Sequence, residues 1–450
     1  MRRRVTRALW LGATLHFALA GAASAEVSSE LSGSILVFPK VLANGTRDTI
    51  ILISNTSNTV VRAHCFYVNA SLRDPEQPEG PLNPRLWLEV DFDLLLTKQQ
   101  PTHWVVSEGR LVNPLDPPCG YFGVCLGGPN VGGQCQTTID CPDSACSNID
   151  CNGAGFDPGR IPPVVPDFEG ELKCVEVDLS GAPISGNHLK GEAMLVQESS
   201  EEPRISDLQG RRVVFPGGDI SQYNALAILG TENNNDGVLV LGGGQCLGSG
   251  PDRDKVCKSD EDCGDSGPCL FEYNACPQAW VVQHYADGAP NPVIEAVRVG
   301  VAPPLELTGP PSQVFTELTF VPCTENFETQ IPTAVTLQFQ TWDEFESVFS
   351  VSTTVTCWGN FFLSDLGAPA LTFAGTQVLD PAGTMFMETR IRPSNASSSG
   401  ILMMAETYIV GKINTQTGFP FATVAAANLH LEGERTQPDI ITVPADQLTP

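Results

Sequence analysis

The nine residues TAVTLQFQT (333–341) alternate apolar and polar side chains, with Val335, Leu337 and Phe339 separated by Thr and Gln. A period of two is typical of a strand that buries one face. Related short runs recur between Gly- and Pro-containing turns, and no long amphipathic helix interrupts them. We therefore predict an all-β protein of Ig-like β-sandwich domains. The other strand-like runs are SILVF (34–38), DTIILISN (48–55), VVRAHCFYV (60–68), RVVF (212–215), GVLVL (237–241), AWVVQHY (279–285) and TYIVG (407–411).

Two cysteine-rich segments form an internal repeat. Both begin Cys-Leu-Gly, and both carry an Asp directly before the third cysteine. The segments contain almost no large apolar side chains, so disulfides are needed to order them. Four thiolates would also suit zinc, but the paired Cys-x2-Cys spacing of zinc ribbons is absent. We predict disulfides within each unit and leave their connectivity open. The cysteines are Cys125, Cys135, Cys141 and Cys146 in the first unit and Cys246, Cys257, Cys263 and Cys269 in the second.

Seven further cysteines lie outside the two repeats. Cys119 and Cys151 flank the first repeat, so we expect them to pair and close its base. Cys323 and Cys357 each end a strand-like run, and their pairing would join neighbouring strands. Cys65 with Cys174 then follows by elimination and leaves Cys276 over. An odd total of 15 means that at least one thiol is free or bonded to another chain.

The first 25 residues have the pattern of a cleaved signal peptide. Arginines at positions 2, 3, 4 and 7 precede a mostly apolar run (8–20), and Ala23-Ser24-Ala25 fits a signal peptidase site. The apolar run is too short to span a membrane, and no later segment is long enough. We therefore expect a secreted, periplasmic or cell-surface protein that is not inserted in a membrane after the signal is removed. This compartment favours disulfides.

The charge of the chain excludes several partners. Its 52 acidic and 25 basic residues give a net charge of −27. Without the four N-terminal arginines, 21 basic groups oppose the 52 acidic ones, which gives −31. A field of this sign repels phosphate backbones and anionic lipids. We therefore expect no nucleic-acid partner, whereas a cell-surface or extracellular partner is compatible with it.

The Pro-rich stretch VAPPLELTGPP (301–311) is the best candidate for a domain boundary. It divides a first β-sandwich region (31–300) from a second sandwich (312–435). The first region carries two Cys-rich insertions, 119–151 and 246–269. Residues 436–450 are expected to form a tail.

The sequence contains no recognisable catalytic or cofactor motif. Its five histidines beyond the signal are far apart, and strand alternation would point His64 outward. The stretch ENNNDGVL resembles part of a calcium loop, but position twelve is Gly243 instead of Glu. Calcium is therefore the one cofactor considered, with Asn234, Asp236, Asp260 and Asp262 as weak ligand candidates. The five tryptophans of the mature chain would suit sugar stacking or, more commonly, burial; they are Trp87, Trp104, Trp280, Trp342 and Trp358.

Three long stretches resemble uncharacterised secreted proteins of delta-proteobacterial and myxobacterial type. They are SILVFPKVLANGTRDTIILISNTSNTVVRAHCFYV (34–68), YNACPQAWVVQHYADG (273–288) and LTFVPCTENFETQIPTAVTLQFQTWDEFESVFSVSTTVTC (318–357). The resemblance implies an exported bacterial protein and supplies no activity, cofactor or catalytic residue. The leading hypothesis is an exported, non-enzymatic structural or binding protein of unknown ligand. The alternatives are a secreted hydrolase whose site forms only in the fold, and a calcium- or carbohydrate-binding adhesive module.

Overall fold

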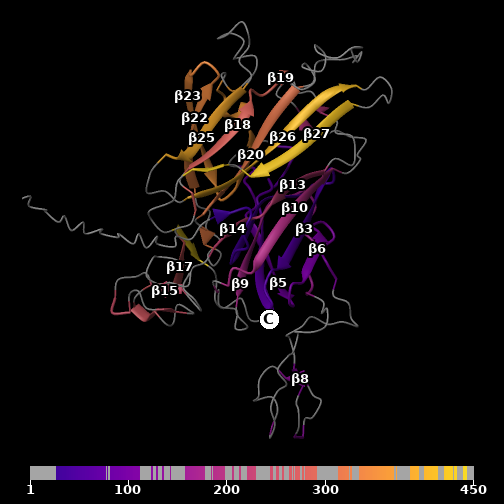
Figure 1. Ribbon diagram of the computed structural model, residues 1–450, viewed down its shortest axis with the longest axis vertical. Helices are drawn as coiled ribbons and strands as arrows, with labels where there is room; N and C mark the ends of the chain where they lie inside the picture. Colours follow the sequence, from indigo (N-terminus) through magenta and orange to yellow (C-terminus); the bar gives the residue numbers. More distant parts are fainter. Residues whose placement is uncertain are drawn as a thin grey trace, which may run out of the picture.

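The computed structural model shows a chain that is almost entirely β-strand (Figure 1), and none of the described ranges contains a helix of seven residues or more. Among the described strands all pairings but one are antiparallel, and the exception joins β21 to β29. The described residues are 27–77, 79, 82–111, 123–124, 128–129, 134–135, 142, 158–177, 184, 186–197, 205–206, 212–213, 220–229, 244–246, 250–252, 256–257, 263–265, 267, 269–273, 276–277, 279–290, 313–323, 325–326, 334–368, 371, 386–394, 400–413, 420–428, 430–432 and 439–442.

The first sandwich is a ten-stranded sheet folded on itself. Its halves are joined by a hairpin, where β2 and β3 pair only at Ala43 and Asp48. One layer has the order β5 (Leu88–Leu96), β4 (Val61–Asn69), β9 (Phe168–Val177), β2 (Ile35–Ala43), β14 (Leu226–Ile228), β1 (Val27–Ser28). The other has the order β6 (Pro101–Val105), β3 (Arg47–Asn55), β10 (Leu189–Gln197), β13 (Ile220–Asn224).

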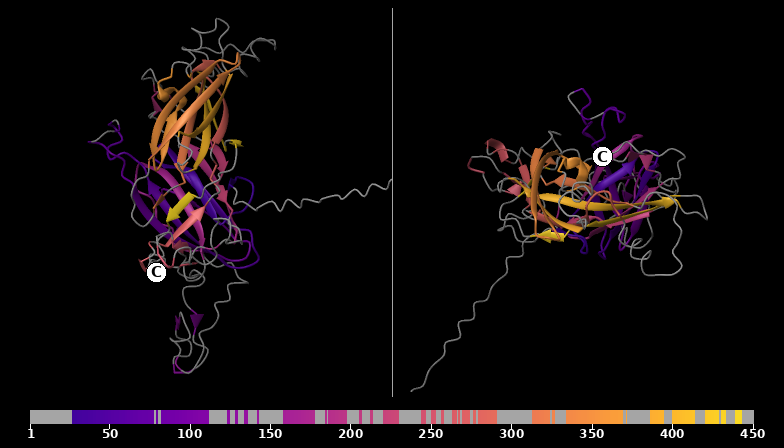
Figure 2. Two further views of the ribbon diagram at one scale, coloured as in Figure 1. Left: turned by 90° about the vertical axis from the view of Figure 1, so that its left-hand side faces the viewer. Right: turned by 90° about the horizontal axis from the view of Figure 1, so that it is seen from above.

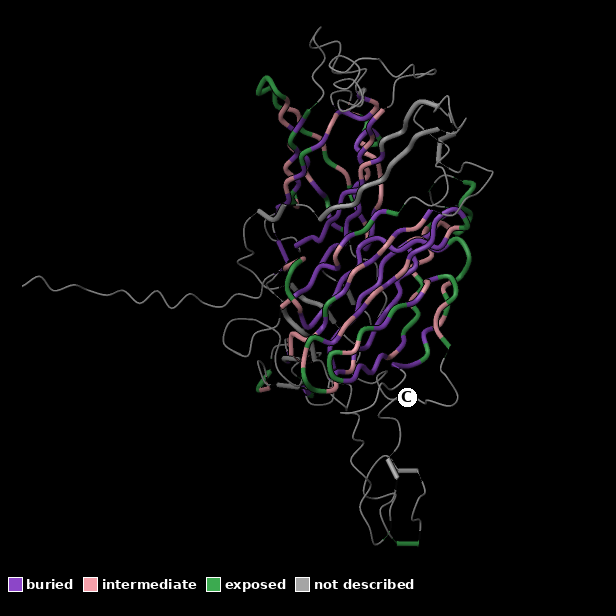
Figure 3. Tube along the Cα trace, turned by 45° about the vertical axis from the view of Figure 1, so that its right-hand side comes forward, coloured by how far each residue is buried: buried purple, intermediate pink, exposed green. Residues whose placement is uncertain are grey.

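A hydrophobic core lies between these two layers. Leu36 and Phe38 of β2 pack in it with Ile51 and Ile53 of β3, and none of the four is more than 1% exposed. The alternation of DTIILISN places Ile51 and Ile53 on the same face of the strand. In Figure 3 the buried residues run along the strands of this region.

The second sandwich is built from two five-stranded sheets. One has the order β23 (Val348–Thr356), β22 (Ala334–Asp343), β25 (Phe386–Pro393), β18 (Ala279–Tyr285), β28 (His430–Glu432). In the other, β20 (Gln313–Pro322) pairs with β26 (Ile401–Ile413), which pairs with β27 (Pro420–Asn428); β19 (Ala289–Pro290) and β24 (Gly359–Phe362) also pair with β20. A 3-10 turn, η3 (Leu363–Leu366), follows β24.

The two sandwiches share one hydrophobic core. Val37 of β2 and Val175 of β9 lie on the first sandwich's face opposite its own core, in one cluster with Leu318, Phe320 and Phe339 of the second. Strand β13 of the first sandwich and strand β27 of the second also lie close together. Figure 2 shows the two sandwiches joined end to end in an elongated body. The packed interface implies that they move as one unit.

The expected division at 301–311 does not coincide with the strand pairing. β18 and β19 precede it in the chain, yet β18 pairs with β25 and β19 pairs with β20. The change from one sandwich to the other therefore comes before Ala279. Hydrophobic pattern identifies a strand but not its neighbours, which is why this segment was assigned to the wrong sandwich.

Short strands organise the Cys-rich units. In the first unit β7 (Gly123–Val124) pairs with β8 (Gln134–Cys135). In the second, β15 (Gly244–Cys246) pairs with β16 (Val256–Cys257) and β17 (Cys269–Tyr273). β17 also pairs with β29 (Asp439–Thr442), which pairs with β21 (Glu325–Asn326), so the expected 436–450 tail contains a strand. A separate two-stranded piece joins β11 (Ile205–Ser206) to β12 (Arg212–Val213). The expected signal peptide, 1–25, lies outside the described residues.

Three disulfides are found among the described cysteines. Cys65 is bonded to Cys174, as elimination predicted, and Cys246 is bonded to Cys263, the first and third cysteines of the second unit. The predicted bond of Cys323 with Cys357 is wrong, because Cys323 is bonded to Cys276. Cys323 follows β20 and Cys357 follows β23, and these strands belong to different sheets. Outside the described part of the chain lie Cys119, Cys125, Cys141, Cys146 and Cys151, so the pairing of Cys119 with Cys151 stays a prediction.

The Cys65–Cys174 bond should contribute strongly to stability, because it closes a sequence separation of 109 residues. Loop-closure entropy predicts that Cys65→Ala/Cys174→Ala lowers the free energy of unfolding by about 4–5 kcal/mol. Urea unfolding monitored by tryptophan fluorescence measures this loss. As a matched comparison, Cys276→Ala/Cys323→Ala opens a separation of 47 residues and should cost about 4 kcal/mol. An unchanged urea midpoint in the first variant would contradict the entropic role.

Candidate functional site

Four charged side chains meet in the interior at the junction of the two sandwiches. Lys40 of β2 and Arg47 of β3 come from the first sandwich, and Glu317 of β20 and Glu406 of β26 come from the second. The side chains of Lys40 and Glu406 are each 1% exposed. We call these four residues the junction cluster. Two cations face two carboxylates, so the cluster has no net formal charge.

The contacts of the cluster are direct. Lys40 Nζ donates to Glu406 Oε2 at 2.7 Å and also to Glu317 Oε2. Arg47 forms a fork on Glu406, since one terminal nitrogen donates to Oε1 and the other donates to Oε2 at 3.1 Å. A bidentate guanidinium–carboxylate pair is the strongest and most directional ion pair in proteins. Each cation of the first sandwich is therefore held by a carboxylate of the second.

Neutral groups complete the hydrogen bonding of the two carboxylates. Tyr408 Oη lies 2.6 Å from Glu317 Oε2 and accepts from Arg47 at 2.8 Å. Ser221 donates to Glu406 Oε1 at 2.7 Å, and Asn360 Nδ2 donates to Glu317 Oε1 at 2.6 Å. All four carboxylate oxygens thus have partners. Buried charges need such saturation, because each unpaired one would carry a large desolvation cost.

The surroundings of Glu406 and Arg47 keep both groups ionised. Burial alone would raise the pKa of Glu406, but the charges of Arg47 and Lys40 and their hydrogen bonds lower it far below its ordinary range. Burial lowers the pKa of Arg47, and the charge of Glu406 more than compensates, so this guanidinium stays protonated. Burial raises the pKa of Tyr408, so its hydroxyl stays neutral. A group fixed in one protonation state is poorly suited to proton transfer near neutral pH.

Lys40 is aimed into the junction by an irregularity in β2. The register of β2 against β9 shifts between Phe38 and Val41. Such a bulge re-aims the side chains of the residues within it. The backbone of Lys40 is held by Tyr223 Oη, which donates to the Lys40 carbonyl and accepts from its N–H at 3.3 Å.

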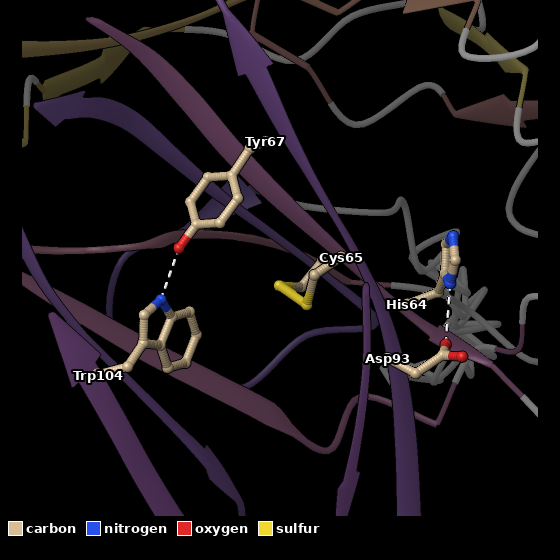
Figure 4. The surroundings of a disulfide bond; sticks show 6 residues. His64, Cys65, Tyr67, Asp93 and Trp104 are labelled. Atoms are coloured by element: carbon tan, nitrogen blue, oxygen red, sulfur yellow. Dashed lines mark hydrogen bonds and ion pairs between the residues drawn. A yellow bond between two sulfur atoms is a disulfide. The ribbon is translucent and has the colours of Figure 1, made fainter. Parts of the chain in front are cut away.

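A second polar group lies beside the Cys65–Cys174 disulfide (Figure 4). Cys65 faces the core of the first sandwich, where Trp104 Nε1 donates to Tyr67 Oη. His64, the preceding residue of β4, points to the other side, and its Nδ1 lies 2.9 Å from Asp93 Oδ1. Alternation along β4 therefore separates the disulfide from the histidine.

Asp93 is ionised and holds two basic groups in place. Arg62 donates to Asp93 Oδ2 at 2.8 Å, and His64 Nε2 lies 3.8 Å from Asp91 Oδ2. Burial raises the pKa of Asp93, but the hydrogen bonds of His64 and Arg62 outweigh it and leave this pKa below its usual value. His64 is thus oriented by a carboxylate, as catalytic histidines are.

His64 nevertheless does not reach solvent. The sequence placed it on the outer face opposite Cys65, but its side chain is 2% exposed. That face of β4 also carries Phe66 and Val68, which are in the core shared with the second sandwich. His64 stacks edge-on with Phe66 at 4.5 Å between ring centroids. An inaccessible imidazole cannot act as a base on an external substrate, so we interpret this pair as structural.

Two further described histidines, His284 and His188, and the buried Asp287 also have internal hydrogen bonds. Burial lowers the pKa of His284 to about 4, and its Nε2 lies 2.8 Å from Thr389 Oγ1. Burial raises the pKa of Asp287 to about 7, although backbone N–H groups of Thr316 and Ser364 donate to it. His188 Nδ1 lies 2.7 Å from Glu176 Oε1.

The tryptophans do not form one sugar-stacking row. Trp104, Trp280 and Trp358 are buried. Trp280 Nε1 donates to the carbonyl of Ile401, and Trp358 Nε1 donates to that of Pro39 at 2.7 Å. These three tryptophans therefore follow the commoner expectation, which is burial. Trp87 and Trp342 are half-buried.

The predicted calcium ligands cannot be placed. Asn234, Asp236, Asp260 and Asp262 all lie outside the described residues, so calcium binding there stays a prediction. Among the residues that the structure describes, no group of three or more His, Cys, Asp or Glu side chains is arranged to hold a metal. No helix in the described ranges is long and apolar enough to cross a membrane.

Comparison with known proteins gives no family. No protein-family model matches the chain, and no curated protein matches it. Evidence for its function therefore comes from its residues and their geometry.

Sequence reasoning missed the junction cluster. Its one local signal is Lys40, a lone cation in the otherwise apolar run SILVFPKVLA (34–43). A lysine within a buried strand implies a carboxylate partner. Glu406 lies 366 positions later in the chain, and nothing in the sequence connects the two.

Removing Glu406 should destabilise both sandwiches. In Glu406→Gln the charges of Lys40 and Arg47 share a single carboxylate, and breaking a buried pair in this way costs about 3–5 kcal/mol. Urea unfolding at pH 7 measures the change. As the control, Glu79→Gln removes the partner of Arg85 from a surface pair in which Glu79 is 57% exposed, and it should cost under about 1 kcal/mol. Equal losses in the two variants would contradict a stabilising role for the cluster.

Asp93 should contribute stability that disappears in acid. Because its folded pKa is lower than its unfolded value of 3.8, ionisation favours the folded state at neutral pH, and this gain is lost as pH falls below about 4. Asp93→Asn should therefore lower the free energy of unfolding by about 2 kcal/mol at pH 7. Urea unfolding at pH 7 and at pH 3 should show this difference shrinking. Asp91→Asn, at a carboxylate that is 47% exposed, is the control and should change little at either pH. A pH-independent loss in Asp93→Asn would contradict this linkage.

Proposed function

We propose that the protein is an exported, non-enzymatic structural or binding protein. The observation that supports this proposal is that two groups of ionisable side chains are bonded to each other inside the protein. The His64–Asp93 pair and the junction cluster are engaged in internal hydrogen bonds and ion pairs, and their side chains are between 1% and 17% exposed. These interactions stabilise a rigid scaffold, and a rigid scaffold suits the presentation of a binding surface.

Export is supported by the cysteine chemistry. Three disulfides join described cysteines, and disulfides persist mainly in oxidising compartments. The signal-like pattern of residues 1–25 and the resemblance to secreted bacterial proteins support the same compartment. We place the mature protein outside the cytoplasm, in the periplasm, at the cell surface or in the medium.

The Cys-rich units fit a role in display. In Figure 1, β8 of the first unit lies beyond the end of the first sandwich, and β15 of the second lies beside the sheets. Disulfide bonding makes such small units rigid without a core of their own. We propose that they serve as exposed structural or contact elements on the two-sandwich body.

A hydrolase screen tests this proposal. Purified mature protein should show no turnover above the buffer rate with ester, peptide, glycoside or phosphate substrates between pH 5 and 9. The matched variant is His64→Gln, which removes the histidine of β4 that Asp93 orients. Turnover that is present in the wild type and lost in His64→Gln would overturn the non-enzymatic function and assign the activity to this pair.

A further inference from the structure

The outward side of one sheet of the second sandwich is a continuous polar surface. Val335, Leu337 and Phe339 of β22 point into the core, so the alternate residues of β22 point away from it. The same alternation applies to the neighbouring strands β23 and β25. We call this surface the outer face; its described members are Ser350, Ser352 and Thr354 of β23, Thr336, Gln338, Gln340 and Trp342 of β22, Glu388, Arg390 and Arg392 of β25, and Val281 and Gln283 of β18.

Strand register arranges the outer face in rows that cross the sheet. One row is Ser350, Gln340, Arg390 and Val281. The next is Ser352, Gln338 and Arg392, and the third pairs Thr354 with Thr336. Hydroxyls, amides and guanidinium groups thus alternate at the strand spacing of about 4.8 Å. These three rows contain two arginines and no carboxylate.

Arg392 is held ready for a ligand. Gln338 Oε1 accepts from Arg392 Nε at 3.2 Å and from one terminal nitrogen at 3.1 Å. Arg392 is exposed, and a guanidinium has five N–H donors in a fixed plane. The bonds to Gln338 fix that plane and leave further N–H groups for an acceptor. A carboxylate is the acceptor that matches a planar guanidinium in two parallel bonds.

Aromatic and apolar side chains lie at the hairpin end of the outer face. Trp342 pairs with Val348 in register and is half-buried, while Val348 is 52% exposed. Phe386 is 36% exposed and contacts Tyr285 with 5.4 Å between ring centroids. Glu388, the one acidic residue among the described members of the outer face, is in register with Trp342 and accepts from Gln283 at 3.4 Å. A half-buried indole beside hydrogen-bonding side chains offers an apolar surface with polar neighbours.

We propose that the outer face binds a polysaccharide that carries carboxylate groups. The inference rests on the proposed non-enzymatic binding function and names its ligand class. Serine, threonine and glutamine side chains would bond the hydroxyls of the sugar units, Trp342 would pack against a ring, and Arg392 and Arg390 would bind the carboxylates. Charge complementarity is local, because the outer face carries two cations, Arg390 and Arg392, and one carboxylate, Glu388, on a chain of net charge −27.

Other occupants fit this surface less well. A stable protein interface has an apolar centre and a polar rim, whereas the centre of the outer face is polar. Nucleic acid carries a charge every few ångströms, and the net acidity of the protein opposes so dense a polyanion. A polysaccharide with one carboxylate on each sugar unit has a lower charge density than duplex DNA and meets less of that repulsion, and salt screens charges beyond about 8 Å under physiological conditions. Contacts with Arg392 itself are shorter than this distance.

Affinity electrophoresis of the full-length mature protein in gels containing polygalacturonate tests the proposal. Polygalacturonate should retard the wild-type protein. Fully methyl-esterified polygalacturonate, which has no free carboxylates, should retard it at least tenfold less. Arg392→Gln should weaken retardation by polygalacturonate at least tenfold, and Arg392→Lys should lie between the two. Arg160→Gln, at an exposed arginine in the first sandwich, is the matched control and should behave as the wild type.

The proposal is overturned if polygalacturonate does not retard the wild type, if the neutral ester retards it equally, or if Arg392→Gln is retarded as strongly as the wild type. Tighter binding to duplex DNA than to polygalacturonate would overturn it in favour of a phosphate polyanion. Thermal midpoints of the variants should equal that of the wild type, since Arg392 is on the surface. Shortening of the polysaccharide during binding would contradict the non-enzymatic function but support this binding surface, so the two proposals fail separately.

Discussion

The ion pairs between Lys40 and Arg47 on one side and Glu317 and Glu406 on the other constrain the entire molecule. The first sandwich contributes two cations to the junction, and carboxylates of the second sandwich form ion pairs with both. Apolar packing alone would tolerate small shifts between the two halves, whereas a forked guanidinium–carboxylate pair fixes distance and angle. The shared hydrophobic core packs the two sandwiches together, and the junction cluster adds directional contacts that align them. Rigid presentation of the outer face and of the Cys-rich units depends on that alignment.

Periodicity along the chain was sufficient to predict the fold class. The stretch 333–341 lies almost wholly within β22, and 279–285 coincides with β18. An alternating pattern reports which face of a strand is buried, and this is a local property. It does not report the neighbours of a strand, so β18 was assigned to the first sandwich. The Ig-like order of strands stays a prediction for the same reason.

The candidate sites show the same limit more strongly. Cys65 was paired with Cys174 by elimination, and the two lie opposite each other on β4 and β9. Cys323 was paired with the wrong partner because both sequence runs end at a cysteine, although their strands lie in different sheets. His64 was expected in solvent because the first sandwich was considered alone. Its face is covered by the second sandwich, and a buried face between two units has no separate signature in sequence.

The pairing of β17 with β29 has a consequence for the order of assembly. β17 lies at the edge of the second Cys-rich unit, in the middle of the chain, yet its partner is formed by residues 439–442 near the end. β18, a few residues later, likewise pairs with β25 and β28, which both follow it in the chain. A chain that emerges N-terminus first must therefore leave one edge of each of these middle strands unpaired until residues near its end are available. Long-range pairing of this kind is slow and exposes open edges meanwhile. The early Cys246–Cys263 bond, which needs only local sequence, would hold that segment compact during the delay.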